Sequence, residues 1–500
     1  MDIHGKQKLS KKTSQSNNKH TAPKNSQPIS KNIIENEHLF KNIFNNCSDI
    51  MFREVKIHSQ VILLFIYVDG MVDTEIITTN VLEPLLYDGL PQGLGGIESL
   101  EQVLEQERFS VLQTKKLSDV EEITEYILKG NLAIFVDGEG NALLADVKKF
   151  ETRSIEEPST EASLRGSKES FTENLRTNTM LLRRIIVSPK LKVESLKIGK
   201  MTKTDIAVMY IEGIVSISVL NEVRKRLKQI QIDEILESGY VEESIEDNHF
   251  SPFPQILNSE RPDVTSSGLL EGKVVILTNG SPYSLIVPMT FWNGLQATDD
   301  YSERFLFVTM IRWVRYIFTI FSIIFPSIYI ALTNYHQEMV PPDLMLNIAV
   351  LRERSPFPTL IEVFLMEFMF EGLQEAGIRL PKQIGPLVSI VGALVIGEAA
   401  VSAGIISAPV VIIVSAAGIA SFIIPRYSFG FPMRMLRYPI MILAGVFGLF
   451  GIAVGIIAVL IHLINLKSFG TPYLTPVSPR NKHGLKDVLL RWPRERVNKG

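Results

Sequence analysis

Four glutamates in the apolar C-terminal part of this 500-residue chain are the side chains best placed to do chemistry. Glu367, Glu371 and Glu375 recur at four-residue spacing, and Glu398 lies in the middle of the apolar stretch SIVGALVIGEAAVSAGIIS (389–407). A charged carboxylate at the centre of a bilayer costs about 2.5–3.5 kcal/mol on insertion scales, so acids in such segments usually have a function. The chemistry open to them is attraction of a cation or uptake of a proton.

The segment 357–377 must position the first three acids. With about 100° of turn per helical residue, Glu367, Glu371 and Glu375 fall within an arc of roughly 80°. The opposite side of this helix is apolar, which predicts an amphipathic helix with an acidic stripe. Two interpretations stay open: an interfacial helix whose acids are in water outside the membrane, or a membrane helix whose acids face water in a pore.

Small residues surround Glu398, which lies between Gly397 and Ala399. Such residues let a second helix approach closely, so the acid can be buried in protein instead of facing lipid. Ser402 lies about one turn further along the same helix face and can hydrogen-bond within that contact. Three roles stay open for Glu398: a protonated acid hydrogen-bonded at a helix contact, an acid near a helix end that reaches water, or a group that changes its protonation or partner during gating.

Long apolar runs in the region 299–466 predict an all-α, polytopic membrane domain with four to five spans. The spans are expected at about 305–333, 387–406, 410–424 and 439–466, with 357–377 as the candidate fifth. Arg312 and Arg315, near the start of the first span, are expected to extend to the cytoplasmic interface. In the last span, Gly451 and Gly455 predict close helix packing, either within one subunit or between subunits.

Charge by itself does not decide the topology of these spans. The tail 467–500 is basic, which favours the cytoplasmic side of a membrane. With four spans, the loop that holds Arg426, Arg434 and Arg437 falls outside, and with five spans the basic tail does.

The first 298 residues alternate charged and apolar segments, as a soluble α/β region does. LLFIYVDGMVDTEII (63–77) resembles IAVMYIEGIVSISVL (206–220), since each is an apolar strand that ends in an acid and a glycine. KGNLAIFVDGEGNALL (129–144) resembles EGKVVILTNGSPYSLI (271–286), and both predict two strands joined by a glycine turn.

The two motif pairs have nearly the same spacing along the chain. Tyr67 aligns with Tyr210 at an offset of 143 residues, and Gly130 aligns with Gly272 at an offset of 142. A shared offset favours an internal duplication and therefore two related α/β lobes. The expected division, in chain order, is a disordered basic tail at 1–35, a lobe at 36–150, a polar linker at 151–179 and a second lobe at 180–298. Helices are expected at 97–106 in the first lobe and at 218–238 in the second.

Several classes of site are excluded by the residues themselves. Cys47 is the only cysteine, which excludes an intramolecular disulfide and any multi-cysteine metal centre. The eight histidines are scattered, and no nucleotide-binding glycine loop, HExxH pair or GxSxG motif occurs. A net charge of −3 gives no reason to expect nucleic acid as a partner. We therefore expect no enzymatic activity, no cofactor and no metal site.

Longer stretches of the chain are similar to one known family. They are RGSKESFTENLRTNTMLLRR, ERPD, GSPYSLIVP, DDYSERF, NYHQEMVP, RERSPFPTLIEVFLMEFMFEGLQEAGIRLPKQIG, SIVGALVIGEAAVSAGIIS and SFGTPYLTPVSP, in this order between about residues 165 and 480. In these stretches the chain resembles the A subunit of bacterial spore germination receptors, the GerA family.

The resemblance implies an integral protein of the spore inner membrane. The Lys-rich N-terminal tail by itself is expected on the cytoplasmic side, and the apolar runs predict several spans. The resemblance also implies a transporter-like B subunit, a lipoprotein C subunit, further copies of the chain itself and membrane lipid as partners. Such A subunits are thought to oligomerise into an ion channel that opens when a nutrient binds. The alternatives are a secondary transporter, with Glu398 as its proton or ion site, and a membrane-anchored scaffold.

Overall fold

The protein divides into two compact units. The computed structural model describes residues 27–57, 61–83, 114–149, 158, 161, 165–379, 397–480 and 482–492. One unit comprises Met1–Lys41, Phe52–Tyr67 and Asp73–Val147. The other comprises Asn42–Met51, Val68–Val72 and Lys148–Gly500.

The first unit is built on a five-stranded sheet with the order β1-β2-β4-β5-β3. Its strands are β1 (Ile50–Ile57), β2 (Val61–Val68), β3 (Thr114–Leu117), β4 (Leu132–Val136) and β5 (Ala142–Ala145). The described helices around it are α1 (Ile33–Ile43), α2 (Thr74–Ile76), which continues into the π-helical turn η1 (Ile77–Leu82), and α5 (Val120–Leu128). β2 is apolar throughout because both of its faces are covered, and Leu63 to Ile66 are fully buried.

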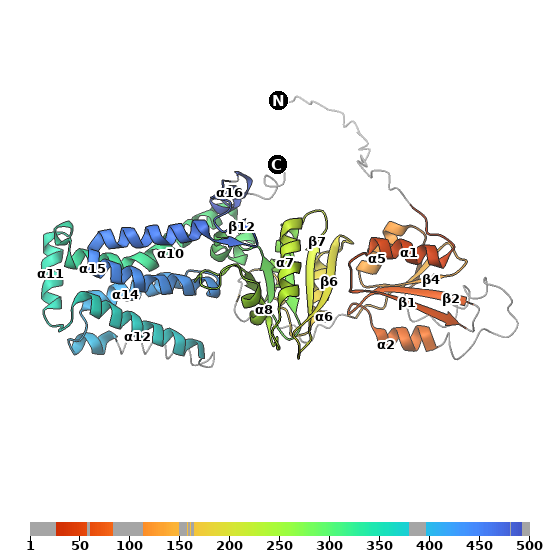
Figure 1. Ribbon diagram of the computed structural model, residues 1–500, viewed down its shortest axis with the longest axis horizontal. Coiled ribbons are helices and arrows are strands. Elements are labelled where there is room, and N and C mark those ends of the chain that lie inside the picture. Colours follow the sequence, from red (N-terminus) through yellow and green to blue (C-terminus); the bar gives the residue numbers. More distant parts are fainter. Residues whose placement is uncertain are drawn as a thin grey trace, which may run out of the picture. The chain divides into compact units, whose positions relative to one another are not determined.

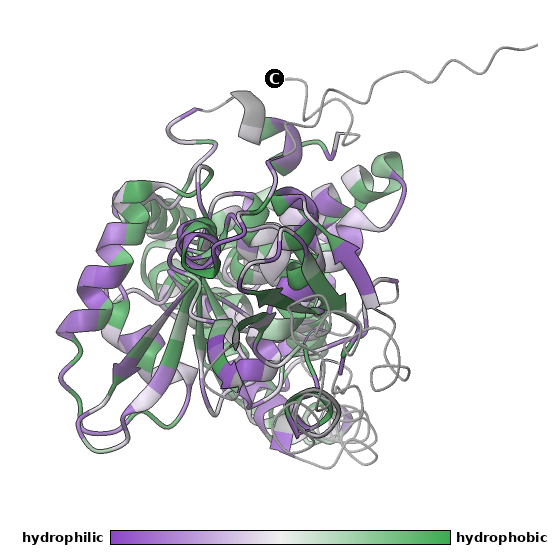
Figure 2. Ribbon diagram, turned by 90° about the vertical axis from the view of Figure 1, so that its right-hand side faces the viewer, coloured by the Kyte–Doolittle hydropathy of each residue, from purple (hydrophilic) through white to green (hydrophobic). Residues whose placement is uncertain are grey.

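The second unit begins with a sheet of the order β6-β7-β9-β10-β8. Its strands are β6 (Leu191–Ile198), β7 (Thr204–Ile211), β8 (Leu257–Ser259), β9 (Val274–Thr278) and β10 (Ser284–Val287), and its helices are α6 (Leu175–Ile185), α7 (Ile217–Gln229), α8 (Ser238–Ile245) and α9 (Pro262–Leu270). Side chains alternate along β7, so Ile206, Val208 and Tyr210 join one buried cluster with Val223 of α7 and Val241 of α8. α6 and α9 pack against each other and against β7. Figure 2 shows hydrophobic stretches in the strands, which also have hydrophilic parts, beside helices that carry both kinds of residue.

The two sheets share their strand order and their register. Leu63 pairs with Val136 in the first sheet, and Ile206 pairs with Thr278 in the second. The second pair lies 143 and 142 residues after the first, which are the offsets of the sequence motifs.

A hydrogen-bonded clip at the start of α1 recurs at the start of α6. The side chain of Asn36 accepts from the backbone N–H of Ser30 at 2.9 Å and donates to its carbonyl at 2.6 Å. Asn178 makes the same two bonds with Thr172, at 2.8 and 2.6 Å. Each residue of the second clip follows its counterpart by 142 positions, so the correspondence extends to side-chain bonding.

Some element boundaries differ from the sequence prediction. The predicted linker at 151–179 includes the first turn of α6, which begins at Leu175 because the Asn174 side chain caps the helix N-terminus. The predicted helix at 218–238 ends early, at Gln229, because the carbonyls of Ile232 and Asp233 accept hydrogen bonds from the β6–β7 turn instead of from a helix. The predicted helix at 97–106 lies outside the described residues.

The rest of the second unit is helical. It contains α10 (Phe305–Asn334), α11 (Pro342–Arg352), α12 (Thr359–Arg379), a helical segment at 397–402, α14 (Ala408–Ser421) and α15 (Tyr427–Asn465). α10, α14 and α15 run side by side (Figure 1) and share a buried core that includes Ile330, Val414 and Met441. Two of the described helices, α10 and α15, are long and apolar enough to cross a membrane.

Three chain turns meet at the end of this bundle where α10 stops. The Thr359 hydroxyl, at the start of α12, donates to Asn334 Oδ1 at 2.9 Å. The Ser355 hydroxyl donates to the Ile405 carbonyl at 3.1 Å. The turn before α14 therefore lies beside the α11–α12 connection.

α15 is a hairpin of two antiparallel helices. Gly448 interrupts it with φ +61° and ψ −140°, a conformation open mainly to glycine. A Cβ on Gly455 would lie 3.2 Å from Ile440 Cγ1, whereas a straight helix would separate these residues by about 22 Å. The sequence predicts one continuous final span at 439–466, and the structure instead reverses the chain inside it.

Contacts at both ends of the hairpin agree with this reversal. The Phe253 ring lies 6.3 Å from that of Phe429 in the first half and 6.0 Å from that of His462 in the second. At the turn, the Tyr335 hydroxyl donates to the Gly445 carbonyl at 2.8 Å. The C-terminal tail follows with β11 (Lys467–Ser468), β12 (Thr471–Pro472) and α16 (Lys482–Val488).

Candidate functional site

The acidic stripe of α12 faces arginines of the first half of α15. Glu367 pairs with Arg437, and both side chains are at least 97% buried. Glu371 pairs with Arg434 at 2.9 Å and is partly exposed. We call these four residues the acid–arginine seam.

Helix geometry explains why the two glutamates meet the two arginines. The two glutamates lie four residues apart on α12 and the two arginines three apart on α15, so each pair projects from one face of its helix. Arg434 also donates to the Gln374 side chain and lies over the Phe431 ring, with its guanidinium carbon 4.9 Å from the centroid. Glu367 Oε1 and Arg437 Nε are buried and have no hydrogen-bond partner among the described residues. The buried pair of the seam, Glu367 and Arg437, therefore carries opposite charges and unbonded polar atoms inside an apolar bundle.

The third acid of the stripe is in a different environment. Glu375 pairs with Arg379 of its own helix at 2.6 Å, and its side chain is about half exposed. The sequence assigns one environment to all three acids, whereas the structure places Glu367 in the interior, Glu371 at its edge and Glu375 at the surface. The stripe is thus partly neutralised by arginines that lie 63 and 70 residues further along the chain.

Glu398 and Ser402 are exposed in the segment 397–402, and within the described ranges Glu398 takes part in no ion pair. Gly397 is buried, and a Cβ there would lie 3.4 Å from Val411 of α14. The helix ends at Ser402 because Gly404 adopts φ +70°. The first part of the span predicted at 387–406 lies outside the described residues.

A further buried acid was missed by sequence reasoning. Glu362 in α12 is fully buried and accepts hydrogen bonds from the Ser407 hydroxyl at 2.7 Å and the Ser407 backbone N–H at 3.3 Å. Ser407 immediately precedes α14, so the carboxylate lies at a helix N-terminus, where the helix dipole favours negative charge. The sequence signal that could have identified Glu362 is its position as an acid within the apolar stretch TLIEVFL, outside the arc of the acidic stripe.

Gly451 and Gly455 lie in the second half of α15 and are buried against its first half. A Cβ on either residue would contact Leu443 or Ile440. The close packing that these glycines permit is therefore within one chain.

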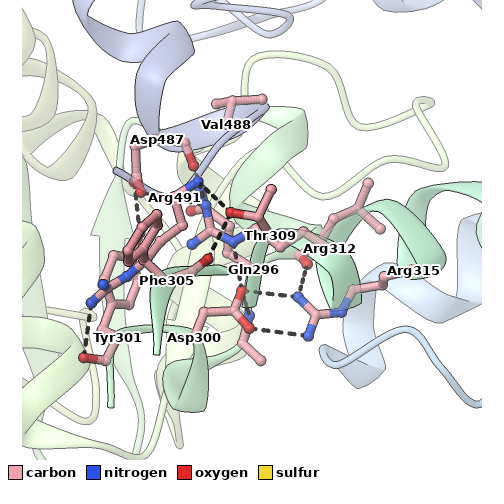
Figure 3. Close-up of polar contacts among 12 residues, drawn as sticks. Gln296, Asp300, Tyr301, Phe305, Thr309, Arg312, Arg315, Asp487, Val488 and Arg491 are labelled. Carbon is pink, nitrogen blue, oxygen red and sulfur yellow. Dashed lines mark hydrogen bonds and ion pairs between the residues drawn. The ribbon is translucent and has the colours of Figure 1, made fainter. Parts of the chain in front are cut away.

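A second group of buried charges connects the sheet region to α10. Asp300, in the short helix η3 (Thr298–Tyr301), accepts from Arg312 Nε at 2.9 Å and from Arg315 Nη1 at 3.0 Å (Figure 3). The sequence predicts that both arginines extend to a membrane interface, but they are buried because Asp300 supplies a carboxylate beside them.

The C-terminal segment closes over the same charges. The Tyr301 hydroxyl donates to Asp487 Oδ2 at 2.7 Å, and Arg312 donates to the Asp487 carbonyl. The Tyr316 hydroxyl donates to the Val488 carbonyl at 2.7 Å. Burial and the Asp487 carboxylate raise the pKa of Tyr301, so its hydroxyl keeps the proton that it donates.

We call Asp300, Tyr301, Arg312, Arg315 and Asp487 the charged junction. It joins three parts of the chain: the end of the sheet region, the first apolar helix and the C-terminal segment (Figure 3). Arg312 contacts both Asp300 and Asp487, which makes the junction a candidate for mechanical coupling between these parts.

The described residues offer little for metal or thiol chemistry. Within the described ranges, no three His, Cys, Asp or Glu side chains are grouped as a metal site. Cys47 is buried, and burial raises the pKa of its thiol, which disfavours the reactive thiolate.

The comparisons with known proteins agree with one another. A model of the family described as Bacillus/Clostridium GerA spore germination protein matches residues 38–499. "Uncharacterized membrane protein YfkQ" of Bacillus subtilis (strain 168) is 46% identical over 466 residues, which cover 93% of this chain and 90% of that protein. "Spore germination protein KA" of the same organism is 43% identical over 467 residues, which cover 93% and 84%.

One solved structure is also similar in sequence. The crystal structure of the N-terminal domain of the A subunit of the Bacillus megaterium spore germinant receptor GerK3 is 35% identical, covers 54% of this chain and 99% of that chain, and superposes with a TM-score of 0.43. The family match spans nearly the whole chain and includes the seam and the charged junction. The chain therefore belongs to the GerA family of spore germination proteins.

Proposed function

We propose that this protein is the A-type subunit of a nutrient-sensing germination receptor in the spore inner membrane, and that copies of it form an ion channel that nutrient opens. Family membership and the names of its relatives support a role in germination. A transporter-like B subunit and a lipoprotein C subunit complete the receptor in this proposal. The chain itself performs no catalysis.

The observation that carries the channel proposal is the acid–arginine seam. Ionisable residues inside membrane segments are rare because of their cost, and they typically mark ion or proton pathways. In the described conformation Arg437 and Arg434 neutralise Glu367 and Glu371. Separation of α12 from α15 would free two carboxylates at membrane depth, and carboxylates attract cations in channels.

The hairpin in α15 suggests a topology that removes the charge conflict. Both ends of α15 contact the sheet region: Arg426 donates to the Asn258 carbonyl of β8 at 3.4 Å, and His462 lies 2.9 Å from the Ser251 hydroxyl. We propose six crossings, made by α10, α12, the span that the sequence predicts at 387–406, α14 and the two halves of α15. The start of α15, with Arg426, Arg434 and Arg437, and the basic tail 467–500 then lie on the cytoplasmic side with the sheets. This is the arrangement that the positive-inside rule favours.

The two sheet regions are proposed to be duplicated lobes that receive the signal. Their common strand order, register and asparagine clip support the duplication. The charged junction then transmits a movement of the second lobe to α10, because Asp300 and Arg312 are bonded across the boundary.

The test is ion flux through the reconstituted receptor in liposomes. A channel passes cations down their gradient when nutrient is added, and the triple change Glu367→Gln, Glu371→Gln and Glu375→Gln lowers that flux at equal protein content. Flux coupled to a fixed amount of solute would indicate a transporter instead. No flux at all would indicate a membrane-anchored scaffold.

A further inference from the structure

The C-terminal segment 482–492 is bonded along one side of the first apolar helix. The Val488 carbonyl accepts from the Tyr316 hydroxyl at 2.7 Å, and the Arg491 backbone N–H donates to Thr309 Oγ1 at 3.3 Å. Thr309 and Tyr316 lie seven residues apart on α10, which is about two helical turns. Figure 3 shows Val488 and Arg491 beside the first turns of α10. The segment therefore follows α10 over these two turns, close to its start.

These turns lie at the level of a membrane interface in the proposed topology. α10 has 30 residues and is about 45 Å long at 1.5 Å per residue, whereas the hydrocarbon core of a bilayer is about 30 Å thick. About ten residues therefore extend beyond the core. The charges of Arg312, Arg315 and Asp300 assign this excess to the start of α10, because charges cost less among headgroups and water than in hydrocarbon.

The segment also lies next to the side of α10 that would face lipid. Five large apolar side chains of α10 are each at least 46% exposed: Leu306, Met310, Trp313, Ile317 and Ile320. They fall within an arc of about 80° on the helix, which we call the lipid-facing stripe. Thr309 and Tyr316 lie within about 40° of one edge of this arc. The Tyr316 ring also contacts the Trp313 ring, with 6.2 Å between centroids. The segment is thus a direct neighbour of the lipid-facing stripe.

The exposed side chains of the segment suit a position among lipid headgroups. Leu490 is 46% exposed, Trp492 is 37% exposed, and Lys486 is exposed in the last turn of α16. Apolar and aromatic side chains combined with lysine are typical of elements that lie in a membrane interface. The tail 467–500 carries eight Lys and Arg residues against two acids, and one of these acids, Asp487, is bonded to Tyr301. The excess of positive charge favours anionic headgroups as the partner.

From this geometry we propose that the segment 482–492 binds the anionic bilayer surface on the side of the sheets. Leu490 and Trp492 then lie at the boundary between headgroups and acyl chains, and Lys486 lies among headgroup phosphates. Because Asp487 of the same segment is bonded to Arg312, bound lipid would hold the charged junction closed. This inference rests on the proposed membrane insertion of α10.

The test measures the depth of the segment with a nitroxide spin label on the full-length chain in lipid nanodiscs. Cys47 is the only cysteine, so a Cys47→Ala background allows one labelled position at a time. The label is placed at Leu490→Cys. Accessibility to oxygen, which dissolves in lipid, is compared with accessibility to a water-soluble nickel chelate. Nanodiscs of phosphatidylcholine alone are compared with nanodiscs that also contain the anionic lipid phosphatidylglycerol.

Two label positions and two charge changes calibrate the measurement. Ile317→Cys, on the lipid-facing stripe, should report lipid. Met201→Cys is 81% exposed in the β6–β7 turn, at the end of the second sheet away from Val287, and should report water. Lys486→Glu reverses the charge of the segment, and Lys200→Glu, in the same β6–β7 turn, is the matched change outside it.

The expected result is a lipid-like signal at position 490 in the anionic nanodiscs. Lys486→Glu should shift it toward the water-like signal of position 201, and Lys200→Glu should leave it unchanged. A water-like signal at 490 with a lipid-like signal at 317 would overturn the lipid contact of the segment alone. Water-like signals at both positions would overturn the membrane insertion of α10 as well.

Two further outcomes would also contradict the proposal. A lipid-like signal at 490 that depends neither on phosphatidylglycerol nor on Lys486 would overturn the assignment to anionic headgroups. Protection at 490 that appears only when the partner subunits are added would assign the segment to a protein contact.

Discussion

Arg437 and Glu367 form an ion pair between two helices of the apolar bundle, and both side chains are buried. An ion pair in this position is weak support for stability in itself, because the two groups lose their hydration. Loss of one partner is more serious, since it leaves the other charge uncompensated in an apolar surrounding.

Glu367→Gln should therefore destabilise the helical region by about 3–5 kcal/mol, the range for breaking a buried pair. The double change Glu367→Met with Arg437→Met should recover most of that loss because no charge is left unpaired. Thermal unfolding of the detergent-solubilised protein measures both effects. Glu375→Gln is the matched control, since its pair is at the surface and its removal should cost less than about 1 kcal/mol. Equal destabilisation by all three variants would contradict this account.

Asp300→Asn should loosen the C-terminal segment. The change keeps the size of the side chain but leaves Arg312 and Arg315 without the carboxylate that they share, and the expected loss is about 3–5 kcal/mol. Limited proteolysis should then cut the chain within the segment 482–492 faster than in the parent. Asp343→Asn, an exposed position on α11, provides the control. A cleavage rate that is the same in both variants would show that the junction does not hold the segment.

Glu242 should make the stability of the second sheet region depend on pH. Burial raises the pKa of this carboxyl to about 7, and the charges of Glu246 and Glu237 add to the rise. A group whose pKa is higher in the folded chain contributes its full stability below its unfolded pKa, about 4.5, and loses it as the pH rises through about 7. The melting temperature should fall across this window, and Glu242→Gln should flatten the fall. The exposed neighbour Glu243→Gln should leave the pH profile of the parent unchanged.

Gly448→Ala should strain the turn of the α15 hairpin. The backbone there is open mainly to glycine, which suggests a cost of about 1–3 kcal/mol. A Cβ would also lie 3.1 Å from His336 Nε2 and 3.2 Å from Tyr335 Cβ. Gly430→Ala, in the first half of α15 with open space around it, should instead be neutral or stabilising by up to about 1 kcal/mol. If the two variants melt at the same temperature, α15 does not reverse at Gly448.

Local features of this protein follow from residues that are neighbours in the chain. The apolar run at 305–333 predicts a long helix, and α10 occupies Phe305–Asn334. The motif offsets of 143 and 142 residues reappear in the pairing of Leu63 with Val136 and of Ile206 with Thr278. Strand, turn and helix signals are read within a few residues, so the sequence by itself determined these elements.

Only the tertiary structure decided which charges meet and where the chain reverses. Both interpretations of the pattern placed Glu367 in contact with water, and its burial depends on Arg437, 70 residues away. Several glycines in the last apolar segment could have formed the turn, and Gly448 does so where Tyr335 bonds to the neighbouring Gly445 carbonyl. Arg312 is buried between Asp300 and Asp487, and Asp487 lies 175 residues beyond it in the chain. The free energy of a buried charge is set by the groups packed around it, and those groups are brought together by the fold, not by their order in the sequence.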